Sequence, residues 1–320
     1  MKKNYSPKPL FLERMQSLLK DKQDFQNYLE ILKKEPVHSL RCNTLKISVE
    51  DLKKRLEEKN WKIKQPFKDF PEIMIVENEL LPGELGRALE HLLGYYYIQE
   101  IASMLPVLVL NPKENERVLD LCASPGSKTT QIAAKMNNKG LLIANEVKFG
   151  RIKILSANTE RCGVMNILIT KRDGIALCKK FKENNLYFDK ILLDAPCSGE
   201  GTFRSSQKGL EMWNIKTIEN LSKLQKSLIA NAIEILNPRG ELVYSTCTHA
   251  PEENEEVIDF ALKNFENIKL EKIKLPVNCR NGLTSWNGKN YDKELIKTCR
   301  IYPQDNDTEG FFIAKIRKIK

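Results

Sequence analysis

Metal-binding patterns, membrane spans and secretion signals are missing from this sequence of 320 residues. It has three histidines, and none of its eight cysteines forms a C-x-x-C pair, so the usual ligand spacing of a zinc site is absent. No apolar run reaches the length of a membrane span, and the first residues lack the apolar core of a signal peptide. These absences predict a cytoplasmic protein with no metal, no membrane contact and no disulfide framework. Each cysteine is then expected to be a small buried residue or a reactive thiol.

The composition is that of a folded protein with a basic balance. Hydrophobic residues make up 41% and charged residues 29%, and 320 residues are enough for one large domain and a smaller one. The net charge is +10, and the excess is concentrated in residues 148–182, where nine basic residues face two acidic ones. A solvated helix face is the simpler interpretation of such a segment. A polyanionic partner becomes the better one if the chemistry elsewhere in the chain points to it.

The first hundred residues predict a small module of helices and strands. Apolar spacing predicts helices over residues 10–33, 49–60 and 95–110, and strand-like segments over residues 38–47 and near Trp61 and Met74. We therefore divide the chain into an N-terminal helical and α+β module over residues 1–94 and a main domain over residues 95–320.

The main domain shows the alternation that is typical of a doubly wound α/β fold. Short apolar runs, each followed by polar loop residues and a longer helical pattern, have the sequences RVLDL, GLLIAN, NILIT, KILLD and ELVYS. Continuous apolar strands separated by helices indicate a mostly parallel sheet that is covered on both faces. In such a sheet, ligands bind beyond the carboxyl ends of the strands.

The loop after the first strand of this domain has the position of a nucleotide-binding loop. It reads CASPGSKT and leads into a helix. It is not a P-loop, and Gly126 stands alone where a dinucleotide loop has several glycines, so a cofactor without a pyrophosphate fits better. Acidic residues end the next three strands, at Glu146, Asp173 and Asp194. Together with the loop they predict a site for a nucleoside cofactor.

Two cysteines follow the ends of adjacent strands. Cys197 stands in the segment DAPCSGEG after the fourth strand, and Cys247 stands in STCT after the fifth. A single cysteine in such a position is more often a buried core residue than a catalytic one. Two thiols that face the same cofactor cleft favour a catalytic interpretation.

Methylation of cytosine at C5 is a reaction that needs two such groups. C5 is a poor nucleophile until a thiolate adds at C6 and turns the C5–C6 edge into an enamine that can attack a methyl group. A second group must then help to remove the proton on C5 so that the thiolate can leave. An acidic helix start follows Cys247, so we expect the helix dipole to stabilise its thiolate. Asp194 is suited to protonate N3 and to hold the exocyclic amine.

These motifs resemble those of the NOL1/NOP2/Sun family of RNA cytosine-5 methyltransferases. The resemblance covers nearly the whole chain and rests on LDLCASPGSKTTQ, LLDAPCSGEGTFR, LVYSTCT with the following PEENEEV, and RIYPQDNDTEGFFIAKIRK. Two further segments, RCNTLK and YYYIQEIASMLP, add to it. The resemblance implies a seven-stranded Rossmann-like methyltransferase sheet, an RRM-like N-terminal module that binds RNA, and S-adenosylmethionine as the cofactor.

The resemblance also implies a role for each candidate residue. Cys247 would be the nucleophile, and Cys197 would release the product. Asp194 and Lys128 would contact the target base, and Arg151 would help to hold Glu146 or the RNA. The residues that it implies for binding the cofactor are Cys122, Ala123, Ser124, Pro125, Gly126, Ser127, Lys128, Glu146, Arg151, Asp173 and Asp194.

The segments MNNKGLLIANE, RCG, DAPCSGEG and YPQDNDTEGFF are similar to enzymes of the RsmF type, which modify small-subunit rRNA. We therefore expect a monomeric enzyme that forms a covalent bond between Cys247 and C6 of a cytosine in small-subunit rRNA. Methylation of tRNA is the alternative with the same chemistry. The alternatives of other classes are a ribosome-assembly factor that acts by binding RNA, and a methyltransferase for DNA or a small molecule.

Overall fold

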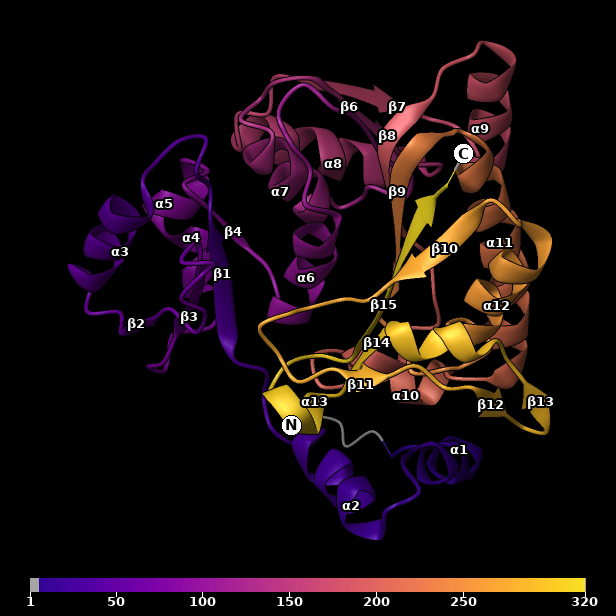
Figure 1. The fold of residues 1–320 in the computed structure, drawn as a ribbon. Coiled ribbons are helices and arrows are strands. Elements are labelled where there is room, and N and C mark those ends of the chain that lie inside the picture. Colours follow the sequence, from indigo (N-terminus) through magenta and orange to yellow (C-terminus); the bar gives the residue numbers. More distant parts are fainter. Residues whose placement is uncertain (1–5, 320) are drawn as a thin grey trace.

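The computed structural model describes residues 6–319, in which a large sheet covered on both faces stands beside a small sheet (Figure 1). The parallel strands of the large sheet are β5 (Arg117–Asp120), β6 (Leu141–Asn145), β7 (Ile167–Thr170), β8 (Phe188–Asp194) and β9 (Leu236–Thr246). Their order across the sheet is β9-β8-β5-β6-β7, and β15 (Phe311–Lys318) lies antiparallel to β9. The expectation of a mostly parallel doubly wound α/β sheet is confirmed.

Two sets of helices cover this sheet. One face packs against α6 (Ile101–Leu110), α7 (Ser127–Lys135) and α8 (Phe149–Arg161). The other packs against α9 (Gly174–Glu183), α11 (Ile215–Glu234) and α12 (Glu255–Asn264). Alternate residues of one strand serve the two cores, since Leu192 belongs to the first and Leu193 to the second. No helix within residues 6–319 is long and apolar enough to cross a membrane.

The sheet has nine strands where seven were expected. The difference lies at one edge, where β10 (Ile268–Glu271) and β14 (Cys299–Ile301) pair with opposite ends of β15. The short strand β11 (Arg280–Asn281) then pairs with β14. Two short strands therefore share the place of one. The remaining elements are η1 (Glu200–Thr202), α10 (Lys208–Met212), β12 (Ser285–Trp286), β13 (Lys289–Asn290), η2 (Lys293–Lys297) and α13 (Pro303–Asn306).

The small sheet has a ferredoxin-like βαββαβ arrangement. Its elements are β1 (His38–Cys42), α3 (Val49–Glu57), β2 (Ile63–Lys64), β3 (Ile73–Val76), α4 (Glu84–Arg87), α5 (Leu89–Leu92) and β4 (Tyr96–Ile98), with the antiparallel strand order β2-β3-β1-β4. The prediction of one helix over residues 95–110 is therefore wrong in its first part. The aromatic residues that open this segment pair with β1 instead, and Glu100 caps the start of α6.

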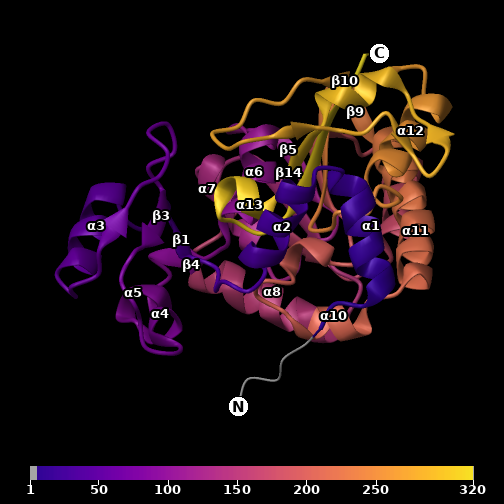
Figure 2. The same ribbon diagram turned by 90° about the horizontal axis from the view of Figure 1, so that it is seen from below.

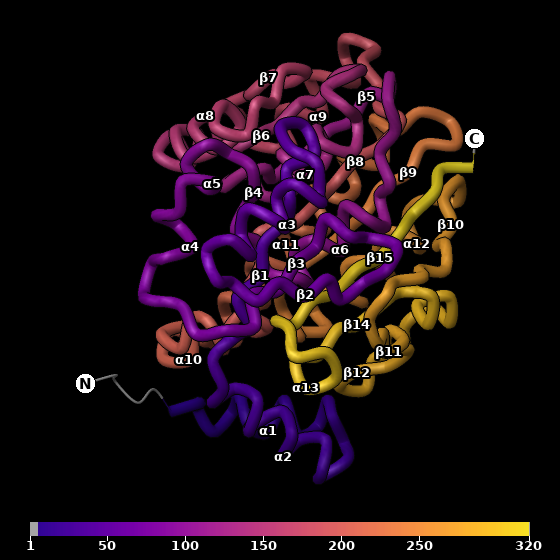
Figure 3. Tube along the Cα trace, turned by 90° about the vertical axis from the view of Figure 1, so that its left-hand side faces the viewer, coloured from indigo at the N-terminus to yellow at the C-terminus, as the bar shows by residue number. Residues whose placement is uncertain are grey.

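One face of the small sheet packs against the main domain, and the sheet lies in front of that domain in Figure 3. Arg41 of β1 is 2% exposed and donates hydrogen bonds to Gln99 Oε1 (2.9 Å), to Thr130 Oγ1 (2.9 Å) and to the Ser127 carbonyl (3.2 Å). Ile73 of β3 packs against α6 in the same interface. An RRM uses one face of its sheet to stack bases. Here that face is covered by α6 and α7, so it is not open to RNA.

The helical pattern over residues 10–33 forms two helices, α1 (Pro9–Leu19) and α2 (Lys22–Ile31), because Lys20 adopts a positive φ and Asp21 caps α2. The pair lies away from the small sheet (Figures 1 and 2). Its buried side chains pack on the main domain, as Phe11 does against the rings of Phe203 and Trp213. The division of the chain at residues 94 and 95 stays a prediction.

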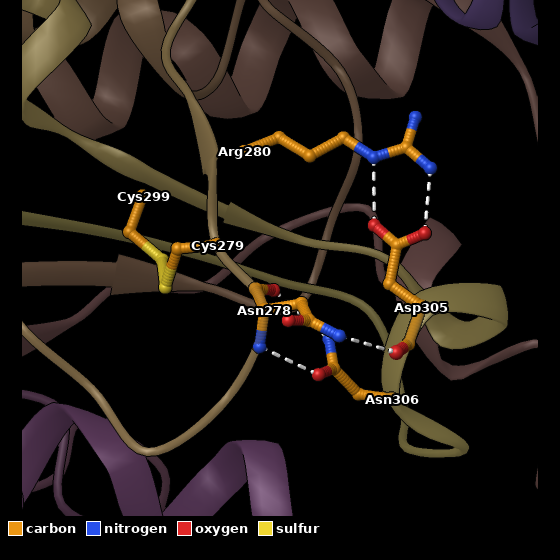
Figure 4. The surroundings of a disulfide bond; sticks show 6 residues. All are labelled: Asn278, Cys279, Arg280, Cys299, Asp305 and Asn306. Carbon is orange, nitrogen blue, oxygen red and sulfur yellow. Dashed lines mark hydrogen bonds and ion pairs between the residues drawn. A yellow bond between two sulfur atoms is a disulfide. The ribbon is translucent and has the colours of Figure 1, made fainter.

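A disulfide joins Cys279 and Cys299, which corrects the expectation that the cysteines are free (Figure 4). The register of β11 with β14 brings the two together although 20 residues separate them. Next to it, Arg280 forms ion pairs with Asp305, which lies in α13, and with Asp24, which lies in α2. This corner therefore ties the edge of the large sheet to the N-terminal helices.

A buried ion pair joins the start of α12 to β14. Arg300 and Glu255 are bonded through Nε–Oε1 (2.6 Å) and Nη2–Oε2 (2.5 Å), and their side chains are 3% and 0% exposed. Glu255→Gln should lower the free energy of unfolding by about 3 kcal/mol, because it leaves a buried guanidinium without its counter-charge. Urea unfolding followed by circular dichroism measures this. Glu294→Gln, which breaks the exposed pair with Lys297, is the control and should change it by less than about 0.5 kcal/mol. Equal effects of the two substitutions would contradict the expectation.

Candidate active site

The two candidate cysteines meet at the carboxyl end of the large sheet. In the parallel pair of β8 and β9, Asp194 lies opposite Ser245, and each strand runs into a loop that carries one cysteine. The Sγ atoms of Cys197 and Cys247 are 3.2 Å apart and form a hydrogen bond. The structure therefore brings together the two thiols that the sequence predicted to share a cleft.

The electrostatics of the pair are unequal. The hydrogen bond to Cys247, together with burial, raises the pKa of Cys197 well above its usual range. Either sulfur can be the donor of this hydrogen bond.

The helix start that the sequence predicts after Cys247 is that of α12. Helix α12 begins at Glu255, eight residues after Cys247, and its N-cap is Asn254. This N-cap contacts both neighbours of Cys247, since Asn254 accepts from Thr246 Oγ1 (2.5 Å) and donates to the Thr248 carbonyl (2.9 Å). The stabilisation of a Cys247 thiolate by this helix start stays a prediction.

A close backbone contact holds the loop of Cys197 against that of Cys247. The Gly201 N–H donates to the Cys247 carbonyl (2.9 Å), and the Gly201 carbonyl accepts from the Gly310 N–H (2.8 Å). A Cβ atom at Gly201 would lie 2.2 Å from the Gly310 carbonyl oxygen, so this position requires glycine.

Two buried carboxylates, those of Glu200 and Glu253, form hydrogen bonds with the loops that carry the cysteines. Glu200 accepts hydrogen bonds from the Trp213 indole (2.7 Å), from Thr248 Oγ1 (3.1 Å) and from the His249 N–H (3.2 Å). Glu253 accepts from the Ser198 N–H (3.0 Å) and from Gln225 Nε2 (2.8 Å). Burial raises the pKa of Glu253 to about 7. These groups bind the loops through backbone and side-chain donors on both sides of each cysteine.

Asp194 forms the polar centre beside the cysteines. Its Oδ2 lies 2.8 Å from Lys128 Nζ, and its Oδ1 accepts from Ser245 Oγ (2.7 Å). Lys128 also donates to Ser103 Oγ (2.9 Å), and its ammonium lies 5.2 Å from the centre of the Phe311 ring. The predicted pair of Asp194 and Lys128 is therefore in direct contact, and each partner is fixed by a hydroxyl.

A cavity of about 230 Å³ opens next to this pair. Its lining residues are Ser103, Asp120, Cys122, Ala123, Ser124, Pro125, Ser127, Lys128 and Asp194. Seven of them come from the predicted cofactor set. The loop begins α7 at Gly126, whose φ of 104° places it in the left-handed region that favours glycine. The cavity therefore joins the predicted loop to the end of β8.

Four residues of the predicted cofactor set lie outside the lining of this cavity, namely Gly126, Glu146, Arg151 and Asp173. Glu146 is 4% exposed, and its carboxylate contacts Arg151 Nη1 (3.2 Å) and accepts from the Lys148 N–H (2.8 Å). Arg151 also donates to the Ser124 carbonyl, so it links the end of β6 to the loop. Asp173 is exposed and accepts from the Ala176 N–H (3.0 Å) as the N-cap of α9.

The structure adds Asp120 and Ser103 to the predicted residues. Asp120 is the last residue of β5 and is 1% exposed, and its Oδ2 accepts from Thr129 Oγ1 (2.6 Å). Its Oδ1 is buried with no hydrogen-bond partner among the described residues, and burial raises its pKa to about 7. An acid at the end of the first strand is a signal that the sequence carries. Ser103 comes from α6, and its contact with Lys128 has no sequence signal.

Residues 6–319 contain no group of three or more His, Cys, Asp or Glu side chains that could hold a metal ion. The polar groups that line the cavity are carboxylates, hydroxyls, one thiol and one ammonium. This set suits a polar organic ligand with hydroxyl and amino groups.

Comparisons with known proteins agree with this geometry. A family model described as 16S rRNA methyltransferase RsmB/F matches residues 107–317, and one for the N-terminal domain of 16S rRNA methyltransferase RsmF matches residues 8–101. The tRNA (cytosine(49)-C(5))-methyltransferase of Pyrococcus abyssi is 45% identical over 94% of this chain and 94% of its own length. The ribosomal RNA small subunit methyltransferase F of Vibrio campbellii is 40% identical over 97% of this chain and 63% of its own length. The chain thus spans less than two thirds of that relative.

Solved structures are similar over nearly the whole chain. A methyltransferase homolog protein from Pyrococcus horikoshii has a TM-score of 0.82 and 36% identity, with 97% of this chain and 99% of that one covered. NSun6 from the same organism, solved with SFG, has a TM-score of 0.80 and 27% identity, with 98% of each chain covered. The family model alone covers more than half of the sequence. The chain belongs to the family of the 16S rRNA methyltransferases RsmB/F.

Proposed function

We propose that this protein is an S-adenosylmethionine-dependent RNA methyltransferase that acts on C5 of a cytosine, with small-subunit rRNA as its substrate. The observation that carries the proposal is the 3.2 Å contact between Cys197 and Cys247, beside the ion pair of Asp194 and Lys128. A thiolate, a second thiol and a group for the N3–N4 edge of the base are the parts that the reaction requires. All of them come from one chain, so we propose that the enzyme acts as a monomer. An RNA substrate of this kind favours the cytoplasm.

The cavity fits S-adenosylmethionine in its donors. The loop of residues 122–128 and the orphaned carboxylate oxygen of Asp120 would hold the amino-acid part of the cofactor. Glu146, held by Arg151, stands at the end of β6, where an acidic side chain accepts hydrogen bonds from ribose hydroxyls. Asp173 at the end of β7 would complete the site. When bound, S-adenosylmethionine supplies an electrophilic methyl group.

The chain's own residues account for the addition step. The thiolate of Cys247 bonds to C6 of the cytosine, and the electron pair of the C5–C6 double bond moves toward N3. The pair of Asp194 and Lys128 supplies a proton to N3, while Asp194 accepts a hydrogen bond from the exocyclic amine. The hydrogen bond between the sulfurs of Cys197 and Cys247 keeps the nucleophile oriented before this step.

Release of the product reverses the roles of the two cysteines. Once Cys247 is a thioether on C6, it no longer carries the charge that holds the proton on Cys197. The pKa of Cys197 then falls, because its hydrogen bond to Cys247 is the main cause of the raised value. Cys197 then loses its own proton to water and, as a thiolate, takes the proton from C5. The C5–C6 double bond forms again, Cys247 leaves as a thiolate, and the proton on N3 returns to the pair of Asp194 and Lys128.

The similarity to RsmF over residues 8–101 and 107–317 supports rRNA as the substrate. The second candidate is tRNA, because the Pyrococcus abyssi tRNA methyltransferase matches this chain over 94% of both lengths. We further propose that residues 1–94 contribute to RNA binding through a surface other than the covered face of the small sheet.

Bisulfite sequencing of total RNA from cells with and without the gene tests the function. Loss of one protected cytosine in small-subunit rRNA is the expected result. Loss of signals in tRNA would keep the chemistry and change the substrate. An unchanged pattern in both RNAs would contradict the enzymatic proposal and favour an assembly factor that acts by binding.

Asp120→Asn tests the cofactor site. Because the substitution removes the charge of the orphaned carboxylate, we expect the Kd for S-adenosylmethionine to rise about tenfold, which corresponds to about 1.4 kcal/mol. Isothermal titration calorimetry at pH 8 measures it. Ionised Asp120 costs folding free energy above its raised pKa, so Asn at this position should leave the free energy of unfolding at pH 8 unchanged or higher. An unchanged Kd would exclude Asp120 from the site.

Cys197→Ala tests the division of labour between the cysteines. Addition should proceed while elimination stalls, so a covalent enzyme–RNA adduct should accumulate and appear as a retarded band on a denaturing gel. Cys247→Ala is the matched control, since it should form no adduct, transfer no methyl group and still bind RNA. A retarded band with Cys247→Ala and none with Cys197→Ala would exchange the two roles.

A further inference from the structure

The basic segment of residues 148–182 has no part in the proposed chemistry apart from Arg151 and Asp173. It covers α8, the edge strand β7 and α9, of which α8 and α9 lie on opposite faces of the large sheet (Figure 1). Four of its nine basic residues have partners, because Arg151, Lys180 and Lys182 pair with carboxylates and Arg161 donates to backbone carbonyls. The other five are Lys148, Lys153, Lys171, Arg172 and Lys179, and none of their side chains pairs with a carboxylate among the described residues.

An exposed aromatic ring lies among these free charges. Phe149, at the start of α8, is 60% exposed. The ammonium of Lys153 lies 5.1 Å from the centre of its ring, and that of Lys171 lies 5.2 Å from it. We name Phe149, Lys153 and Lys171, with their sequence neighbours Lys148 and Arg172, the β7–α8 patch.

The patch combines the two elements of a single-strand binding surface. An aromatic ring stacks a base whatever its sequence, and lysines beside it contact the phosphates on either side. A second copy of the chain is a poor occupant, because two faces with the same excess of positive charge repel one another. The charge therefore favours a polyanion.

The patch lies at the same edge of the sheet as the active site. Lys171 directly follows β7 and Cys197 follows β8, and the order β8-β5-β6-β7 separates their strands by three spacings. Three spacings amount to roughly 14 Å, the length of about four stacked nucleotides. An RNA strand whose target base enters the site beside Cys247 can thus reach the patch within a few nucleotides.

We propose that the β7–α8 patch binds the RNA strand that flanks the target cytosine, with a base stacked on Phe149 and phosphates on Lys153 and Lys171. This inference rests on the proposed function and adds a location for the substrate outside the catalytic cleft. It also offers an RNA-binding surface in place of the covered face of the small sheet.

The test compares Lys153→Ala/Lys171→Ala with a matched double variant, Lys269→Ala/Lys272→Ala. The control lysines are exposed and have no carboxylate partner among the described residues, and Lys269 lies on β10 at the opposite, amino-terminal end of the parallel strands. The probes are an unmodified small-subunit rRNA transcript and a pool of unmodified tRNA transcripts. Filter binding over a range of salt concentrations gives Kd and its salt dependence without the methyl donor.

We expect the patch variant to raise Kd about tenfold at 0.15 M salt, and to reduce the slope of log Kd against log salt by roughly 1.4. The control variant should keep both values. In methylation assays the patch variant should raise KM and keep kcat, because neither lysine contacts the cysteines or the cavity. Phe149→Ala should raise Kd about fivefold or more, and Phe149→Tyr should restore it, since tyrosine keeps a ring to stack on.

Equal Kd values and slopes for the patch and control variants would overturn the inference. Because binding is measured apart from methyl transfer, this result differs from a failure of the proposed function. If the proposed function failed instead, the wild-type protein would transfer no methyl group to either transcript, whatever its affinity for RNA. Loss of affinity in both double variants alike would indicate a general effect of net charge and would also count against the patch.

Discussion

The parallel pairing of β8 with β9 sets Asp194 opposite Ser245, and the geometry of the site follows from this register. Both strands end at the same edge of the sheet, so the loops that follow them leave side by side. Cys197 comes three residues after Asp194, and Cys247 two residues after Ser245. A shift of the register by one residue would turn Asp194 toward the opposite face and separate the sulfurs. In this register, Ser245 donates a hydrogen bond to Asp194 across the two strands.

Buried charge holds this arrangement in place. The main domain buries several charged groups beside the cysteine loops, namely Glu200, Glu253 and the ion pair of Arg300 with Glu255. Each costs desolvation, and each returns that cost through several hydrogen bonds to backbone N–H groups or to a counter-charge. The raised pKa of Glu253 reflects the free-energy cost of burying its charge. Such groups specify one loop conformation where apolar side chains of similar size would allow several.

The first hundred residues serve the main domain from two sides. The face of the small sheet that carries Arg41 packs against α6 and against α7, the helix that carries Lys128. The helices α1 and α2 pack near Phe203 and Trp213, next to the loop of Cys197. Both parts therefore support elements that carry site residues. RNA that reaches the cleft has to use surfaces that this packing leaves exposed.

How much the sequence predicts differs from element to element. Apolar runs flanked by polar loops indicated the parallel strands, because a strand buried on both faces needs apolar side chains throughout. The pairing of β4 with β1 and the disulfide between Cys279 and Cys299 were not predicted, because both depend on residues far apart in the chain. The candidate residues at the strand ends could be named from the sequence, but Ser103 could not, since nothing local connects α6 to Lys128.

The sequence by itself determined the fold class, the candidate thiols and the family resemblance, because these depend on local patterns and on residue types. The tertiary structure alone decided which side chain faces which. It put the sulfurs of Cys197 and Cys247 3.2 Å apart, joined Asp194 to Lys128, and brought the N-cap of α12 against both neighbours of Cys247. The physical reason is that burial, hydrogen bonding and charge act through distances in space, and the register of β8 with β9 sets those distances.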